Sequence, residues 1–104
     1  MKKAMISQPM GGLTKTELLE IRDKAKVALE EQGYEVLDTV FESFDSCDLC
    51  DPEHIALLHL GKNLEAMALC DAVYFCDGWQ DKRGCRLEHQ AASAYGIKAL
   101  YEKA

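Results

Sequence analysis

Glu88 is the residue whose type and position most sharply indicate chemistry. It lies four positions after Gly84, in the first turns of a predicted helix. A carboxylate that attacks a sugar carbon must be ionised, partly desolvated and held by a rigid element, and a helix N-terminus favours the ionised form. We therefore predict that Glu88 is an ionised nucleophile facing a ligand crevice. A surface glutamate in the first turn of a helix would show the same spacing, and this alternative stays open.

The loop that precedes this helix, residues 77–84, holds groups suited to a planar, anionic ligand. Trp79 is the only tryptophan of the chain, and its indole can stack on a nucleobase. Lys82, Arg83 and Arg86 flank the predicted helix start, where cations and backbone N–H groups can together bind a phosphate or carboxylate. Alternatively, Trp79 covers the core and the basic side chains form a solvated face.

A second candidate loop follows the first predicted strand. Its glycines would let backbone amides approach a ligand, and its polar side chains could hold sugar or phosphate oxygens. The loop matches neither G-x-G-x-x-G nor the phosphate-binding G-x-x-x-x-G-K pattern, so an ordinary glycine-rich turn is the alternative. The candidate binding residues are Ser7, Gln8, Pro9, Met10, Gly11 and Gly12.

The five cysteines predict reduced thiols, because their number is odd and the hydrophobic fraction of the chain, 48%, is ordinary. Cys47-x-x-Cys50 followed by His54 resembles half of a zinc site, but the usual second pair of ligands is missing. We therefore predict neither a metal nor a cofactor.

Two further cysteines bear on a possible thiol enzyme. Cys85 lies near a predicted helix start, which predicts a lowered thiol pKa. A phosphatase-type loop requires an arginine six residues after its cysteine, whereas Lys82 occupies that place after Cys76. Neither cysteine has the expected pattern. His89 points about 100° away from Glu88 around the helix, so we expect it outside the same site.

Alternating strand and helix patterns must position these groups. Thr14 and Glu17 form a capping box at the start of a helix of about five turns that Gly33 ends. Gly61 interrupts the second helical stripe, which predicts one kinked helix or two short ones. The predicted strands are 3–7, 34–38, 72–76 and 97–101; a loop covers 39–51, and helical patterns follow Pro52 and Gly84.

This order predicts an α/β fold with a four-stranded parallel sheet of order 2-1-3-4 and helices on both faces. Ligands of such sheets bind beyond the carboxyl ends of the strands, where the chain reverses its direction of winding. That point lies between the first and third strands. The loops 7–12 and 76–84 should therefore face each other there.

Length and charge bound the class of protein. The 104 residues fit a single domain, 1–104. A formal net charge of -6 argues against partners such as a nucleic-acid polymer or an anionic membrane surface. No apolar run is long enough to span a bilayer, and residues 1–3 lead directly into a strand pattern rather than a signal peptide, so we expect a cytoplasmic protein.

Several motifs together resemble the nucleoside 2-deoxyribosyltransferase-like family over nearly the whole chain. More closely, the chain resembles an uncharacterised branch of short proteins common in phages and prophages. The motifs are Ser7-Gln8-Pro9-Met10, Asp71-Ala72-Val73, Asp77-Gly78-Trp79, Arg83-Gly84-Cys85-Arg86 and Gly84-x-x-x-Glu88-x-x-x-Ala92-x-x-x-Gly96.

The resemblance implies a flavodoxin-like fold and a transferase or hydrolase that acts on 2′-deoxynucleosides or their 5′-monophosphates. Glu88 would attack the anomeric carbon, the base would depart, and a second base or water would complete the reaction. Active transferases usually carry an aspartate six residues before the nucleophile and another on the preceding helix, where this chain has Lys82 and Asn63. Asp77 or Asp81 would then supply the acid that protonates the leaving base.

Two other functions stay open. The missing acidic partners would suit a non-catalytic protein of phage origin that sequesters a nucleotide, and Trp79 could instead anchor a partner in a protein-interaction domain. Basic residues in place of acidic ones favour a 5′-phosphorylated ligand. Related enzymes often complete their sites with a neighbouring subunit and this chain buries little on its own, so we expect a homodimer or larger homo-oligomer.

Overall fold

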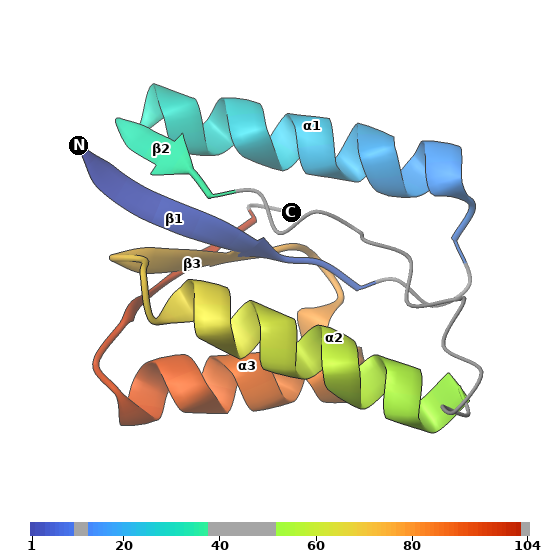
Figure 1. The fold of residues 1–104 in the computed structure, drawn as a ribbon. Coiled ribbons are helices and arrows are strands. Elements are labelled where there is room, and N and C mark those ends of the chain that lie inside the picture. The colour runs from blue at the N-terminus through green and yellow to red at the C-terminus, as the bar shows by residue number, and fades with distance from the viewer. Residues whose placement is uncertain (10–12, 38–51, 103–104) are drawn as a thin grey trace.

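The computed structural model describes residues 1–9, 13–37 and 52–102, with side chains described from residue 57 onward in the last range. It is an α/β flavodoxin-like sandwich, as predicted (Figure 1). Its elements are β1 (Lys2–Ser7), α1 (Lys15–Glu31), β2 (Tyr34–Val36), α2 (Pro52–Met67), β3 (Ala72–Phe75), the 3-10 turn η2 (Trp79–Asp81), α3 (Arg83–Ala94) and β4 (Lys98–Tyr101).

The sheet is parallel and has the order β2-β1-β3-β4, which confirms the predicted topology. β1 pairs with β2 on one side and with β3 on the other, and its last residue, Ser7, lies opposite Phe75. β3 in turn pairs with β4. The chain therefore reverses its winding between β1 and β3, so their carboxyl ends frame the position at which such sheets bind ligands.

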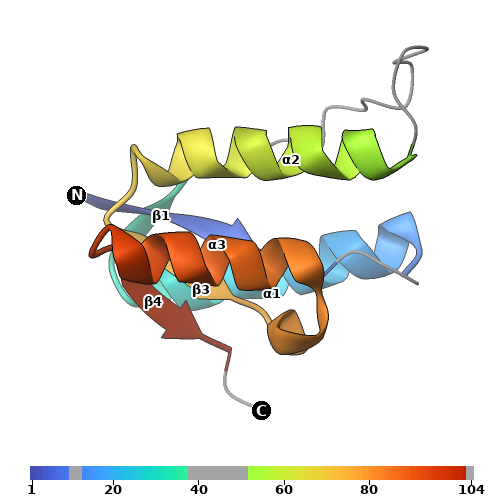
Figure 2. The ribbon, with the colours of Figure 1, turned by 90° about the horizontal axis from the view of Figure 1, so that it is seen from below.

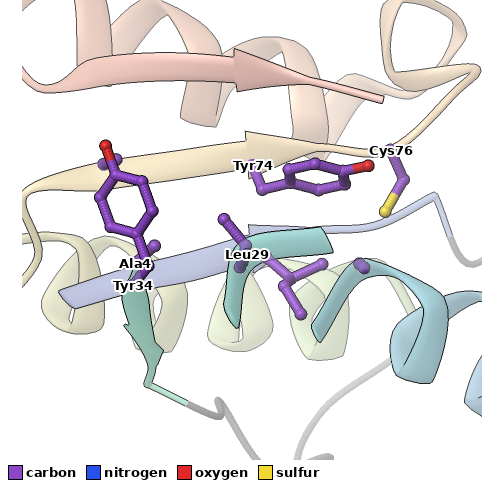
Figure 3. Packing of buried hydrophobic residues seen from close by; sticks show 8 residues of the cluster. Ala4, Leu29, Tyr34, Tyr74 and Cys76 are labelled. Atoms are coloured by element: carbon purple, nitrogen blue, oxygen red, sulfur yellow. The ribbon is translucent and has the colours of Figure 1, made fainter. Parts of the chain in front are cut away.

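One helix covers one face of the sheet. The Thr14 side chain accepts a hydrogen bond from the Glu17 backbone N–H, and the Glu17 side chain reaches back to the Thr14 backbone, so the predicted capping box starts α1. The helix packs its apolar stripe on the sheet through a cluster of buried residues (Figure 3). This cluster consists of Ala4, Ile6, Ala25, Leu29, Tyr34, Ala72, Tyr74 and Cys76.

Two helices cover the opposite face, where α2 and α3 lie side by side (Figures 1 and 2). Met5, Val73 and Phe75 point to this face because successive side chains of a strand alternate between the two faces. They form a second cluster with Met67 of α2 and Ala92 of α3. By the same alternation, Ser7 points toward α3.

Some details differ from the sequence predictions. Gly61 lies within one helix, α2, from Pro52 to Met67, so the two-helix alternative for this stripe is wrong. The loop after β3 contains the turn η2, and α3 begins at Arg83, so that Gly84 lies in its first turn. The predicted loop 39–51 lies outside the described residues. Among the described residues, no helix has the length and hydropathy needed to cross a membrane.

Candidate functional site

The centre of the candidate site is a contact between the end of β1 and α3. Ser7 is fully buried and its hydroxyl donates a hydrogen bond to Glu88 Oε2 at 3.4 Å. Glu88 itself is only 4% exposed. Two residues that the sequence analysis placed in different motifs, 81 positions apart, thus meet at the carboxyl end of the central strand.

Burial controls the ionisation of Glu88. Desolvation raises the pKa of Glu88 to about 7, and the side chains of Ser7 and Asn63 act in the opposite direction. The prediction that the helix N-terminus keeps Glu88 fully ionised is therefore wrong for the free protein, because desolvation is the largest influence on its pKa and Glu88 lies beyond the first turn of α3, where the helix dipole acts. A carboxyl group with a pKa near neutrality can exchange its proton at physiological pH.

One oxygen of this carboxyl group, Glu88 Oε1, is buried without a hydrogen-bond partner among the described residues. Buried polar atoms are rarely unpaired in folded proteins. The Glu88 carboxyl group therefore has one oxygen bonded to Ser7 and a second, buried oxygen that stands out as unpaired.

Cys85 is a member of this cluster that the sequence analysis assigned no role. It lies one helical turn before Glu88 on the same face of α3 and is 4% exposed. Burial raises the pKa of the Cys85 thiol, Glu88 raises it further, and a hydrogen bond with Ser7 lowers it. The predicted lowering by the helix start is therefore wrong, and the neutral thiol packs beside the carboxyl. Burial likewise raises the pKa of Cys76, to about 12.

Gln8 takes part in contacts on the other side of the sheet. Its side-chain N–H donates to the carbonyl oxygen of Leu18 at 2.7 Å, and its carbonyl oxygen accepts a hydrogen bond from Arg22 at 3.5 Å. Both partners belong to α1, so these contacts fix the start of the first loop rather than reach toward Glu88.

Arg22 is a buried cation that the sequence analysis missed, at 4% exposed. The signal was present, because Arg22 shares the inward stripe of α1 with Leu18, Ala25 and Leu29, spaced three or four residues apart. A charged residue on an otherwise apolar stripe indicates a specific buried contact.

The two predicted loops approach each other. Gly78 has a positive φ of 86°, and a Cβ built on it would lie 3.9 Å from the Pro9 side chain. Gly78 turns the chain out of β3 and into η2, which leads to α3. Met10, Gly11 and Gly12 of the first loop lie outside the described residues.

Trp79 lies half-buried in an aromatic cluster. Its ring stacks on His89 with centroids 4.2 Å apart and lies 5.3 Å from the ring of Phe75. His89 Nε2 also forms a 2.7 Å hydrogen bond with the Tyr101 hydroxyl. One face of the indole is therefore occupied by His89. Stacking of a nucleobase on the rest of the indole stays a prediction.

The remaining predicted site residues surround the start of α3. Asp77 and Asp81 are exposed, and neither contributes to the shifted pKa of Glu88. Arg83 and Arg86 are also exposed, while Lys82 is half-buried and caps the helix through its backbone. Asn63 lies on α2, and its side chain lowers the pKa of Glu88. Space around Gly84 is open.

The predicted zinc half-site cannot be placed from the described side chains. Cys47 and Cys50 lie outside the described residues, as does the side chain of His54. Within the part of the chain that the structure describes, no group of three or more His, Cys, Asp or Glu side chains is arranged to hold a metal ion.

Fold and site together define an α/β protein with a buried serine–glutamate pair at the switch point of a parallel sheet. Residues 2–101 match a protein family described as a domain of unknown function, DUF4406, and the chain belongs to this family. The match covers nearly the whole chain. No curated protein and no solved structure matches the sequence.

Proposed function

We propose that this protein cleaves or transfers the N-glycosidic bond of 2′-deoxynucleosides or their 5′-monophosphates, with Glu88 as the nucleophile. The observation that carries the proposal is the buried Glu88 carboxyl group, which has one oxygen held by Ser7 and the other without a partner among the described residues. A nucleophilic carboxylate needs one oxygen oriented and the other free to attack.

In the proposed reaction, Glu88 Oε1 attacks the anomeric carbon of the sugar. The bond between that carbon and the base nitrogen breaks, the base takes the electron pair, and a glycosyl ester forms on Glu88. Water or a second base then attacks the same carbon and releases the Glu88 carboxylate. A proton must reach the departing base, and Asp77 or Asp81 is the proposed donor.

The proposed ligand contacts follow from the positions of the loops. Asn63 lies beside Glu88 and could contact the sugar, while Arg83 and Arg86 stand at the start of α3, where a 5′-phosphate would be favoured. Trp79 would stack on the base. We place the ligand beside Glu88 at the carboxyl ends of β1 and β3, next to the point where the loops that contain Pro9 and Gly78 approach each other.

A second candidate function is ligand capture without chemistry. Asp77 and Asp81 are exposed and have no described contact with Glu88, which favours this alternative because nothing described would hold an acid next to the departing base. The protein would then bind a nucleotide and release it unchanged.

The experiment that tests the proposal is chromatography of free bases after incubation with each 2′-deoxynucleoside and each 5′-monophosphate, with and without a second base. Glu88→Gln keeps the shape of the side chain and removes the nucleophile, so we expect at least a ~10³-fold loss of base release. Glu30→Gln, at an exposed position on α1, is the matched control and should release base like the unmodified protein.

The outcomes separate the two functions. Release by the unmodified protein and Glu30→Gln, but not by Glu88→Gln, supports the glycosyl chemistry. Thermal stabilisation by a monophosphate without base release supports capture. Equal release by Glu88→Gln and the unmodified protein would refute the role of Glu88.

A further inference from the structure

β4 is an edge strand with an open outer side. It pairs with β3 on one side, and no other described strand lies beyond it. Figure 2 shows β4 at the border of the molecule, beside α3 rather than beneath it. Open edge strands carry unpaired N–H and C=O groups and are the usual place for another strand to add.

The backbone of β4 shows which groups face outward. The N–H of Glu102 donates to the carbonyl oxygen of Phe75 at 2.9 Å, so Glu102 continues the strand and bonds to β3. In a parallel ladder, alternate residues bond to the same neighbour. Leu100 therefore also bonds toward β3, and the backbone groups of Ala99 and Tyr101 point to the open side.

The face of β4 opposite α3 is only partly covered. α1 packs on the clusters below β1, β2 and β3, and a hollow of about 640 Å³ lies between α1 and β4. Tyr74 and Leu100 are apolar parts of its lining, and Glu102 lies at its border on the strand. Leu100 is a half-buried aliphatic side chain that packs on the edge of the cluster that α1 covers and borders the hollow.

We propose that β4 pairs with β4 of a second copy of this chain, antiparallel and centred on Leu100, to form one sheet of eight strands. A two-fold axis would pass through the Leu100 pair, giving an isologous interface. This inference does not rest on the proposed function, because it concerns the sheet edge and not the Glu88 site.

The sequence of β4 is self-complementary in this register. With Leu100 opposite Leu100 of the second copy, Lys98 lies opposite Glu102 of the second copy, and the same pair repeats by symmetry. Opposite charges directly across an antiparallel pair are stabilising. Registers centred on Ala99 or Tyr101 would instead place Lys98 or Glu102 opposite the aliphatic Leu100, so the charges select the Leu100 register.

The outward backbone groups of β4, and the side chains on its α3-facing side, are also compatible with this register. Ala99 lies opposite Tyr101 of the second copy, and both residues point their N–H and C=O groups outward. Each such pair exchanges two hydrogen bonds, which gives about four across the interface. The Tyr101 ring packs on Phe75 and bonds to His89 of its own chain, and its 50% exposed part would lie next to the small Ala99 of the second copy.

The test is the mass of the full chain in solution, measured by sedimentation equilibrium over a range of concentrations. We expect the unmodified protein to reach twice the 11.6 kDa of one chain. Lys98→Glu and Glu102→Lys each place like charges opposite each other and should weaken dimerisation about 10-fold or more. The double variant restores both attractive pairs and should restore the dimer.

Two further variants test the register. Ala99→Pro removes an outward N–H that the fold does not use, so it should give a folded monomer by circular dichroism. Leu100→Cys should form an interchain disulfide on oxidation, because directly opposite residues approach closely enough at the two-fold axis. Lys98→Cys is its control and should not crosslink to itself.

A protein that stays monomeric at every concentration would overturn the inference. So would a dimer whose mass none of the charge variants changes, since its interface would lie elsewhere. A double variant that fails to restore the dimer would reject the Leu100 register.

Discussion

The ionisation of the Glu88 carboxyl group depends on two opposing influences, burial and hydrogen bonding. Burial beneath the end of β1 opposes its charge and raises its pKa to about 7, while the side chains of Ser7 and Asn63 favour its charge. Ser7 partly offsets the cost of burial by donating to one oxygen. The group is therefore held close to its midpoint at neutral pH.

This raised pKa predicts how stability depends on pH. Between the pKa of a glutamate in the unfolded chain, about 4, and the folded value near 7, the folded protein binds more protons, so stability falls as pH rises through this window. Glu88→Gln has no proton to lose, and at pH 8 it should be more stable than the unmodified protein by up to about 3 kcal/mol. Urea denaturation at pH 5 and pH 8 measures this difference.

Glu30→Gln is the control for this measurement, because that side chain is exposed. It should leave the pH dependence of stability intact. If Glu88→Gln and the unmodified protein lose stability equally between pH 5 and pH 8, Glu88 is not the group that titrates.

The same group predicts the pH dependence of the proposed reaction. A nucleophilic carboxylate must be ionised, so kcat/KM for base release should rise with pH and reach half its plateau near pH 7. Ser7→Ala removes the hydroxyl that lowers the pKa of Glu88, so the midpoint should move to higher pH. A midpoint that does not move would show that Ser7 has no effect on the ionisation of Glu88.

At the residue scale, sequence motifs singled out candidate residues but did not reveal which residues they contact or how deeply they are buried. Glu88 and Ser7 were both selected from motifs, but nothing local to either residue revealed their contact, because it joins positions 81 residues apart. The pKa of Cys85 was wrongly expected to be lowered for the same reason, because contacts between distant parts of the chain cannot be read from a local motif. Its proximity to a helix start is local, whereas its burial is a property of the folded chain.

At the scale of elements, α1 depends on its first turn. Thr14→Ala removes the side-chain oxygen that accepts from the Glu17 N–H, so it should destabilise the protein by about 1 kcal/mol. Thr16→Ala, two residues further on and exposed, should change stability much less. Thermal denaturation of the two variants compares a cap with an ordinary helix position, and equal effects would exclude capping as the cause.

The turn at Gly78 should be sensitive to substitution. Its φ of 86° is unfavourable for a residue with a Cβ, so Gly78→Ala should cost about 1–2 kcal/mol. Gly84→Ala is the matched control, because Gly84 lies in α3 with open space around it, and alanine favours helix. Chemical denaturation should show Gly78→Ala less stable and Gly84→Ala equal or more stable than the unmodified protein.

Most elements could be predicted because their signals are local. The apolar runs of β1 and β3, the capping box of α1 and the glycines after the helices all lie within a few residues of the features they specify. Gly61 left two alternatives open and did not divide α2, because the glycine costs only about 1 kcal/mol of helix propensity and α2 packs on α3 and the sheet. The turn η2 lacks a periodic pattern, so the sequence offered no signal for it.

At the scale of the whole molecule, the two faces of the sheet are unequally covered. Two helices lie on one face and a single helix on the other, which leaves the hollow beside β4. If the proposed pairing through β4 forms, the thermal midpoint should rise with protein concentration, because association stabilises only the folded chain. Because Lys98→Glu weakens the pairing, its midpoint should be lower at each concentration at which the unmodified protein is a dimer. A constant midpoint for the unmodified protein would count against association.

The large sequence separation between Ser7 and Glu88 also affects when the candidate site forms during folding. β1, α1 and β2 are neighbours along the chain, so their contacts can form early and close only short loops. The Glu88 side chain on α3 must instead contact Ser7 of β1, which was synthesised 81 residues earlier. During most of its synthesis, the growing chain would therefore contain Ser7 but not yet Glu88. The candidate site would be among the last parts to assemble, so a chain released before α3 is complete could pair β1 with β2 and β3 but would lack the Ser7–Glu88 contact.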